Sequence, residues 1–189
     1  MPRREIRLFG DPVLRMTCQT VDIFDSRALS LAEDLLDTAD PEGRAAVAAP
    51  QIGVPLRAFA YSLDGRRGCI FNPVVTHLGG DYREISEACL SVPKMWFDTP
   101  RWSYAVVEGQ DEYGAPITVE GEDVFAQMLQ HETDHLQGTV FVQTLPKARK
   151  RFALGKIREE EWFKRGKGVV SWRGTFQEPP DVLPHRESR

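Results

Sequence analysis

The sequence of 189 residues is poor in cysteine, with only Cys18, Cys69 and Cys89. An odd and sparse set differs from the even disulfide frameworks of small secreted domains. We therefore expect reduced thiols, each of which is a core residue, a nucleophile or a metal ligand.

Long hydrophobic runs and a targeting segment are also missing. No apolar run approaches the roughly 20 residues that a membrane-spanning helix needs. The basic start, Met1–Glu5, is not followed by the apolar core and small-residue cleavage site of a signal peptide. These absences predict a soluble, cytoplasmic protein with no membrane partner.

The sequence has no excess of basic charge. Its 24 basic and 28 acidic residues give a formal net charge of −4. This balance excludes the global positive field on which binding to DNA or an anionic membrane depends, so small or peptide substrates fit better. The length and the hydrophobic content of 41% predict one domain with one good core.

Helical patterns flank a central region of strands. Asp25 or Ser26 can cap a helix that Pro41 and Gly43 end. From about residue 45 to 124, short apolar or alternating runs between Gly, Pro and Asp indicate strands. Examples are Leu56–Tyr61, Cys69–His77, and a hairpin of Trp102–Glu108 with Pro116–Glu120.

A second helical period runs from about Glu122 to Leu136, and Gly138 stops it. Its apolar stripe contains Val124, Phe125, Met128, Leu129 and Leu136. The order of elements predicts a single α+β domain in which mixed or antiparallel strands pack around this central helix.

The C-terminal part is polar. Pro146–Trp162 is predicted to be a charged surface helix, and the last stretch carries three prolines and few apolar residues. We expect a catalytic domain over residues 1–165 and a poorly ordered tail over residues 166–189.

Residues 131–135 read His-Glu-Thr-Asp-His. On a helix the two histidines point from the same face, one turn apart, and can bind one metal ion. The ion would lower the pKa of a bound water toward about 7, and Glu132 between them would take its proton. The motif predicts a metallohydrolase site.

Two histidines leave a tetrahedral catalytic site one protein ligand short, because such sites use three protein ligands and keep a fourth position open. The candidates are Cys89, Cys69, Cys18 and remote Asp or Glu residues, and spacing alone does not choose among them. Taken singly, Cys89 is more often a small buried hydrophobic residue than a ligand.

Three segments together resemble the peptide deformylase family. They are Ala48-Ala49-Pro50-Gln51-Ile52-Gly53, Glu87-Ala88-Cys89-Leu90-Ser91 and Gln130-His131-Glu132-Thr133-Asp134-His135-Leu136-Gln137-Gly138. They occur in the family's order, and the flanking Asp11–Arg15 and Phe71–Pro73 are also similar. The likeness covers about residues 5–145.

The resemblance implies the roles of six residues. Cys89 would be the third metal ligand beside His131 and His135, and Glu132 the general base and then acid. Gln51 and the backbone N–H of Leu90 would stabilise the oxyanion. The activity implied is removal of the formyl group from the N-terminal formyl-methionine of nascent polypeptides, with release of formate.

The resemblance also implies one divalent ion per chain, Fe²⁺, which Zn²⁺, Ni²⁺ or Co²⁺ can replace. The partners implied are nascent formyl-methionyl peptides, and the protein is expected to be a monomer. The basic run Pro146–Arg151 could approach ribosomal RNA, although such a run is more often a solvated helix face.

The chain departs from the family pattern at three positions. Arg44, Ala46 and Ala88 stand where the family usually has glycine. Added side chains at these positions would narrow a substrate slot or strain backbone that glycine tolerates.

Two alternatives remain open at this point. A zincin-type metallopeptidase shares the His-Glu-x-x-His motif but takes a more distant Glu or His as third ligand. A degenerate metal-binding paralogue would have little activity, but the intact Glu132 and Gln51 argue against it.

Overall fold

The computed structural model describes residues 4–40, 44–165 and 169–170. Its main sheet has the strand order β2-β3-β4-β5-β6, and every neighbouring pair is antiparallel. The strands are β2 (Ala46–Ala48), β3 (Ala58–Leu63), β4 (Arg66–Cys89), β5 (Val92–Gln110) and β6 (Pro116–Glu122). The expected α+β class with antiparallel strands is confirmed.

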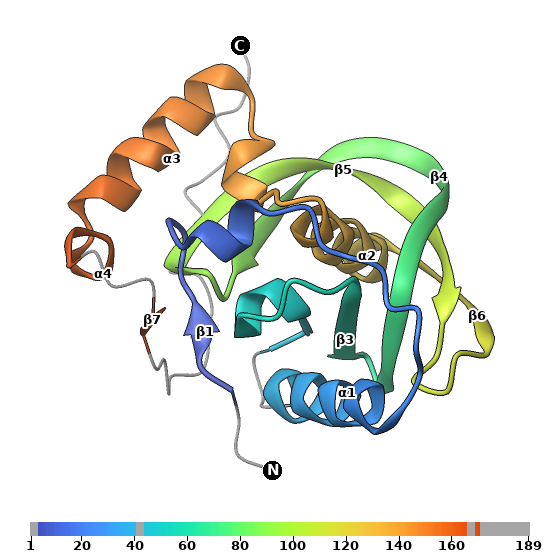
Figure 1. Cartoon of the computed structure of the whole chain (residues 1–189). Helices are drawn as coiled ribbons and strands as arrows, with labels where there is room; N and C mark the ends of the chain where they lie inside the picture. Colours follow the sequence, from blue (N-terminus) through green and yellow to red (C-terminus); the bar gives the residue numbers. More distant parts are fainter. Residues whose placement is uncertain (1–3, 41–43, 166–168, 171–189) are drawn as a thin grey trace.

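Strands β4 and β5 form a long hairpin that arches over the molecule (Figure 1). The expected strands Cys69–His77 and Trp102–Glu108 are parts of it, and both extend further. The expected strand Leu56–Tyr61 begins two residues later, at Ala58. Register shifts, one of them between Ala88 and Cys89, bend the ladder. The chain turns from β4 into β5 at Leu90 and Ser91.

Helix α1 (Ser26–Ala39) begins at the predicted cap. The side chain of Asp25 accepts a hydrogen bond from the backbone N–H of Arg27 at 2.9 Å. Leu31 and Leu35 are buried against the sheet. This helix covers one side of the core, as the sequence predicts.

Helix α2 (Asp123–Leu136) lies under the arch of β5 and β4 (Figure 1) and also contacts β2. It ends before Gly138, whose φ is +73°. A Cβ on Gly138 would lie 2.7 Å from the carbonyl carbon of Arg15, so glycine is required there. Val124 was expected in the apolar stripe, but its side chain is 52% exposed. The buried stripe of the helix begins at Phe125.

The remaining elements are short or peripheral. Within the described residues, the 3₁₀ turn η1 (Pro12–Arg15) precedes α1, and η2 (Ala49–Ile52) connects β2 to β3. A further turn, η3 (Phe141–Gln143), leads from α2 to α3 (Lys147–Glu159) and α4 (Glu161–Lys164). Helix α3 lies on the outside, as predicted for the charged segment (Figure 1). Within the described ranges, no helix is both long enough and apolar enough to cross a membrane.

The C-terminal end of the described chain returns to its beginning. Strand β7 (Val169–Val170) pairs antiparallel with β1 (Ile6–Arg7), a contact that the sequence did not predict. The rest of the expected tail, residues 166–168 and 171–189, lies outside the described residues.

Candidate metal centre

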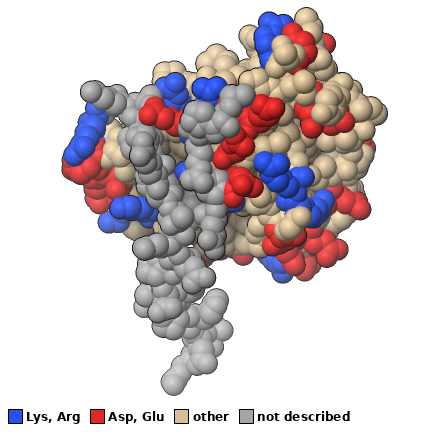
Figure 2. All heavy atoms as spheres, turned by 90° about the horizontal axis from the view of Figure 1, so that it is seen from below, with Lys and Arg blue, Asp and Glu red and all other residues tan. Residues whose placement is uncertain are grey.

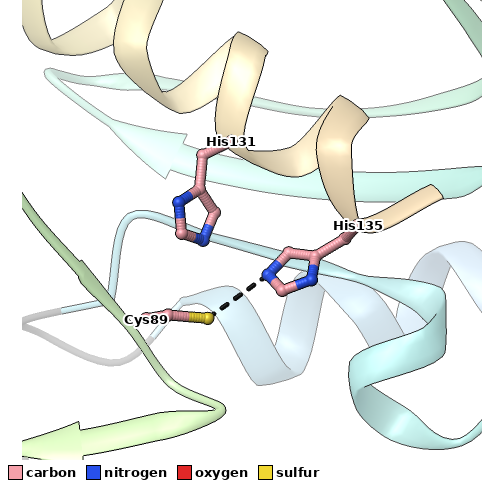
Figure 3. A group of neighbouring side chains, drawn as sticks. All are labelled: Cys89, His131 and His135. Carbon is pink, nitrogen blue, oxygen red and sulfur yellow. Dashed lines mark hydrogen bonds between the residues drawn. The ribbon is translucent and has the colours of Figure 1, made fainter. Parts of the chain in front are cut away.

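Cys89, His131 and His135 converge in the interior of the protein. The two histidines project from one face of α2, one turn apart, toward Cys89 at the end of β4 (Figure 3). One ligand atom from each residue lies within 4.8 Å of the other two. All three side chains are buried. The structure thus brings together the ligand set that the family resemblance implied.

Hydrogen bonds orient the two imidazoles differently. Nδ1 of His131 lies 2.7 Å from Oε1 of Glu87, so an N–H at Nδ1 leaves Nε2 as the free ligand atom. Nε2 of His135 lies 3.2 Å from Sγ of Cys89. Nδ1 of His135 is buried and has no hydrogen-bond partner among the described residues.

This donor set fits a transition-metal ion. One thiolate and two imidazoles suit zinc or ferrous iron, and three protein ligands leave a coordination position for a substrate or a water molecule. The Oε2 atom of Glu132 supports the same conclusion, because it is buried without a partner in the described part of the chain. A buried carboxylate oxygen of this kind needs a donor such as water. The site therefore binds a metal cofactor.

The environment of Glu132 suits proton transfer. Burial raises the pKa of its carboxyl group to about 7, and the positive charge of His131 opposes the increase. A carboxyl group with a pKa near neutrality can both accept and return a proton. Glu132 follows His131 directly on α2, and its carboxyl group is close enough to feel the charge of that imidazole.

Gln51 is held beside the candidate ligands by three contacts. Its Oε1 accepts a hydrogen bond from the backbone N–H of Ala48 at 2.8 Å, which fixes the orientation of the amide. Its Nε2 then lies 3.2 Å from Oγ of Ser91 and 3.4 Å from Sγ of Cys89. Leu90 is buried and follows Cys89 at the hairpin tip. Both expected oxyanion donors thus belong to segments at the ligand cluster.

The other two cysteines are elsewhere in the core. Cys69 packs in a hydrophobic cluster with Phe71, and Cys18 in a second cluster with Leu136. Burial raises the pKa of the Cys18 thiol to about 11 and that of Cys69 further still. Among the described residues, the group placed to hold a metal ion with His131 and His135 contains Cys89 and neither of these two cysteines.

Sequence reasoning missed the groups that support the ligands. Arg101 on β5 donates to both oxygens of Glu87 at 2.9 and 2.8 Å, and to Asp134 at 2.7 Å. Burial alone would raise the pKa of Glu87, but Arg101 and His131 outweigh it and lower that pKa to about 2. A signal was present, since Glu87 stands two residues before Cys89 and so shares its side of the strand.

The three departures from the family pattern are accommodated within the fold. Nη1 of Arg44 donates to the carbonyl of Thr38 at 2.9 Å, so the guanidinium lies against the end of α1. Ala46 is buried in the cluster that contains Tyr61 and Phe125. Ala88 is half-buried opposite Trp96. The side chains of Arg44 and Ala46 therefore both have packing partners within the fold.

Comparison with known proteins agrees with this geometry. Residues 3–151 match the family model described as polypeptide deformylase. The chain belongs to the polypeptide deformylase family. This deformylase-family chain joins the Cys segment on β4 to the His-Glu-x-x-His helix α2.

Named relatives cover nearly the whole chain. It is 43% identical to a peptide deformylase from Parafrankia over 90% of this chain and 93% of the relative. It is 42% identical to one from Acidothermus cellulolyticus over 86% and 89%. The crystal structure of peptide deformylase from Thermus thermophilus superposes with a TM-score of 0.80 at 38% identity, covering 87% of this chain and 99% of that one.

Family membership decides between the readings that the motif left open. A zincin-type metallopeptidase does not fit the deformylase match or the position of Cys89 beside the histidines. A degenerate paralogue fits less well than an active enzyme, because Glu132 is present and buried beside His131 on α2, and Gln51 is held next to Cys89.

Proposed function

We propose that this protein is a peptide deformylase that removes the N-formyl group from the N-terminal formyl-methionine of nascent polypeptides and releases formate. The observation that carries the proposal is the convergence of Cys89, His131 and His135 next to Glu132. Amide hydrolysis needs an activated water, a proton carrier and donors for the developing oxyanion. The chain supplies a candidate for each.

Cys89, His131 and His135 would hold one divalent ion. We propose Fe²⁺ as that ion, with Zn²⁺, Ni²⁺ or Co²⁺ able to replace it, because thiolate and imidazole ligands accept all four. When bound, the ion supplies Lewis acidity and lowers the pKa of water at its open position.

Glu132 is the proposed proton carrier. Its unpartnered Oε2 accepts a proton from the attacking water and later gives that proton to the leaving amine nitrogen. Gln51 Nε2 and the backbone N–H of Leu90 donate to the formyl oxygen as negative charge develops on it. Fixed donors of this kind lower the barrier by a few kcal/mol.

The peptide would bind in an extended form along β2. This strand lies at the edge of the main sheet and pairs only with β3 within it. An edge strand offers backbone donors and acceptors to an added strand. Strand β2 leads into η2, where Gln51 lies, so a peptide paired with it would run toward the ligand cluster.

We assign residues 1–165 to the catalytic domain and infer a cytoplasmic monomer acting on nascent chains. Acidic and basic side chains are interspersed on the face shown in Figure 2, without a field of one sign.

In the basic run Pro146–Arg151, Arg149 pairs with Glu84, and Lys150 donates to the carbonyl of Gln143. These contacts favour a structural role for the run, and ribosome binding would rest on the exposed Lys147 and Arg151.

Formate release tests this function directly. Metal-loaded protein is expected to release formate from formyl-Met-Ala and to leave acetyl-Met-Ala and an unmodified internal peptide bond intact. Cleavage of the internal bond without formate would favour a metallopeptidase. Metal binding without either product would favour the degenerate paralogue.

A further inference from the structure

Arg101 joins two carboxylates from different elements. It donates Nη2 and Nε to Glu87 on β4 at 2.8 and 2.9 Å, and Nη1 to Asp134 on α2 at 2.7 Å. The side chains of Arg101 and Glu87 are 7% and 3% exposed, and that of Asp134 is 31% exposed. A planar guanidinium fits this forked geometry, whereas a lysine ammonium does not.

Glu87 passes this constraint to a metal ligand. Its Oε1 lies 2.7 Å from Nδ1 of His131, and its Oε2 accepts from Nε2 of Gln127 at 3.2 Å. A carboxylate on the non-ligating nitrogen fixes the tautomer and the ring orientation of a metal-binding histidine. Because His135 has no such partner among the described residues, the fold orients the imidazole pair through His131.

The same carboxylate also lies on the strand of the sulfur ligand. Glu87 and Cys89 are two residues apart on β4, and both contact α2: Glu87 through His131 and Cys89 through His135. Strand β5 is fixed beside this point. Gln130 on α2 accepts from the backbone N–H of Trp102 at 3.1 Å and donates to its carbonyl at 2.9 Å. Arg101 therefore links the strand that carries Cys89 to the helix that carries His131, through Glu87 and Asp134.

We propose that Asp134 is a positioning residue for the metal site, acting through Arg101 and Glu87 on His131. Asp134 occupies the second variable place of the His-Glu-x-x-His motif and has no contact with the ligand atoms. Its carboxylate fixes the third arm of Arg101, which keeps the other two on Glu87. The inference rests on the proposed metal site but not on the proposed reaction.

Zinc affinity and ligand geometry test this inference. The variants are Asp134→Asn and Arg101→Lys, and Zn²⁺ affinity is measured by competition with a chromophoric chelator. The absorption spectrum of Co²⁺-loaded protein reports the ligand geometry. Each variant is expected to bind Zn²⁺ about 10- to 100-fold more weakly, the usual effect of losing a group that orients a ligand. The Co²⁺ bands are expected to shift.

Arg149→Lys is the matched control. Arg149 makes the same two-pronged pair with Glu84 at 2.8 and 3.1 Å, but on the exposed surface between α3 and β4. This substitution removes the two-pronged geometry of an exposed ion pair and leaves the site untouched. It is expected to leave Zn²⁺ affinity and the Co²⁺ spectrum unchanged.

A double variant tests the route. If Asp134 acts through Arg101, Asp134→Asn adds nothing to the loss already caused by Arg101→Lys. Unchanged affinity and Co²⁺ spectrum in Asp134→Asn overturn the proposal, even if Arg101→Lys does not fold. Fully additive losses overturn the route through Arg101. Wild-type protein that binds Zn²⁺ tightly but releases no formate would contradict the proposed function and leave this inference standing.

Discussion

The amide nitrogen of Gln51 lies 3.4 Å from the sulfur of Cys89, although 38 positions separate the two residues in the chain. The contact forms because Ala48 and Ser91 hold the two ends of the amide. A side-chain donor is thereby fixed next to a ligand atom before any substrate binds. Such preorganisation is the property that an oxyanion donor requires.

Gln51→Ala is expected to lower kcat by about 100- to 1,000-fold, the usual cost of removing one oxyanion donor. Bound metal is expected to remain at one ion per chain, because the ligands are untouched. Gln143→Ala is a matched control, since Gln143 accepts from the backbone N–H of Val140 at 2.8 Å in the same type of turn. It is expected to affect stability alone. Equal losses of kcat in both variants would remove Gln51 from the chemistry.

Glu132→Gln is expected to keep one metal ion per chain and to lose nearly all deformylation. The amide has a similar shape but cannot accept the proton of the attacking water. Metal content and formate release are measured on the same sample. Loss of the metal would mean that Glu132 is a ligand or a structural residue instead.

The three cysteines are expected to behave differently. Cys89→Asp should still bind a divalent ion, with a preference shifted toward metals that favour oxygen ligands. Cys18→Ser and Cys69→Ser should lower the melting temperature, because each buries a hydroxyl group in a hydrophobic cluster. Metal analysis should find an intact site in both. Loss of the metal from either serine variant would show that the ligand set is wrong.

The stability of the metal-free protein is expected to depend on Glu87 in acid. A carboxyl group whose pKa is lower in the folded state stabilises the fold above its unfolded pKa. For Glu87 that contribution is lost as the pH falls from about 4.5 to about 2. The shift corresponds to about 3 kcal/mol at neutral pH. The free energy of unfolding, measured in urea between pH 7 and pH 3, should therefore fall more steeply for the wild type than for Glu87→Gln, and equal slopes would exclude this role.

Much of the fold could be predicted because its signals are local. The cap at Asp25, the stop at Gly138 and the helical periods beside them need no information from distant residues. The length of β4 could not be predicted in this way. Residues 74–86 of this strand are largely exposed and mix apolar with polar side chains without a regular alternation, so the stretch is held by its pairing with β5.

The candidate ligands also carry local or family signals in the sequence, whereas the residues that orient them depend on the tertiary structure. His131 and His135 are visible at helical spacing, and Cys89 follows only from the family resemblance. Arg101 and Asp134 carry no local signal, because their partnership with Glu87 depends on the register of β4 against β5 and on how α2 packs against β5. Charged residues of this kind resemble surface residues until the tertiary structure buries them.

The most direct test of the account is a titration of metal into the metal-free protein, with formate release from formyl-Met-Ala and bound metal measured on the same samples. The account predicts that formate release rises in proportion to bound metal and saturates at one ion per chain. Formate release by the metal-free protein, or saturated metal binding with no formate released, would contradict it.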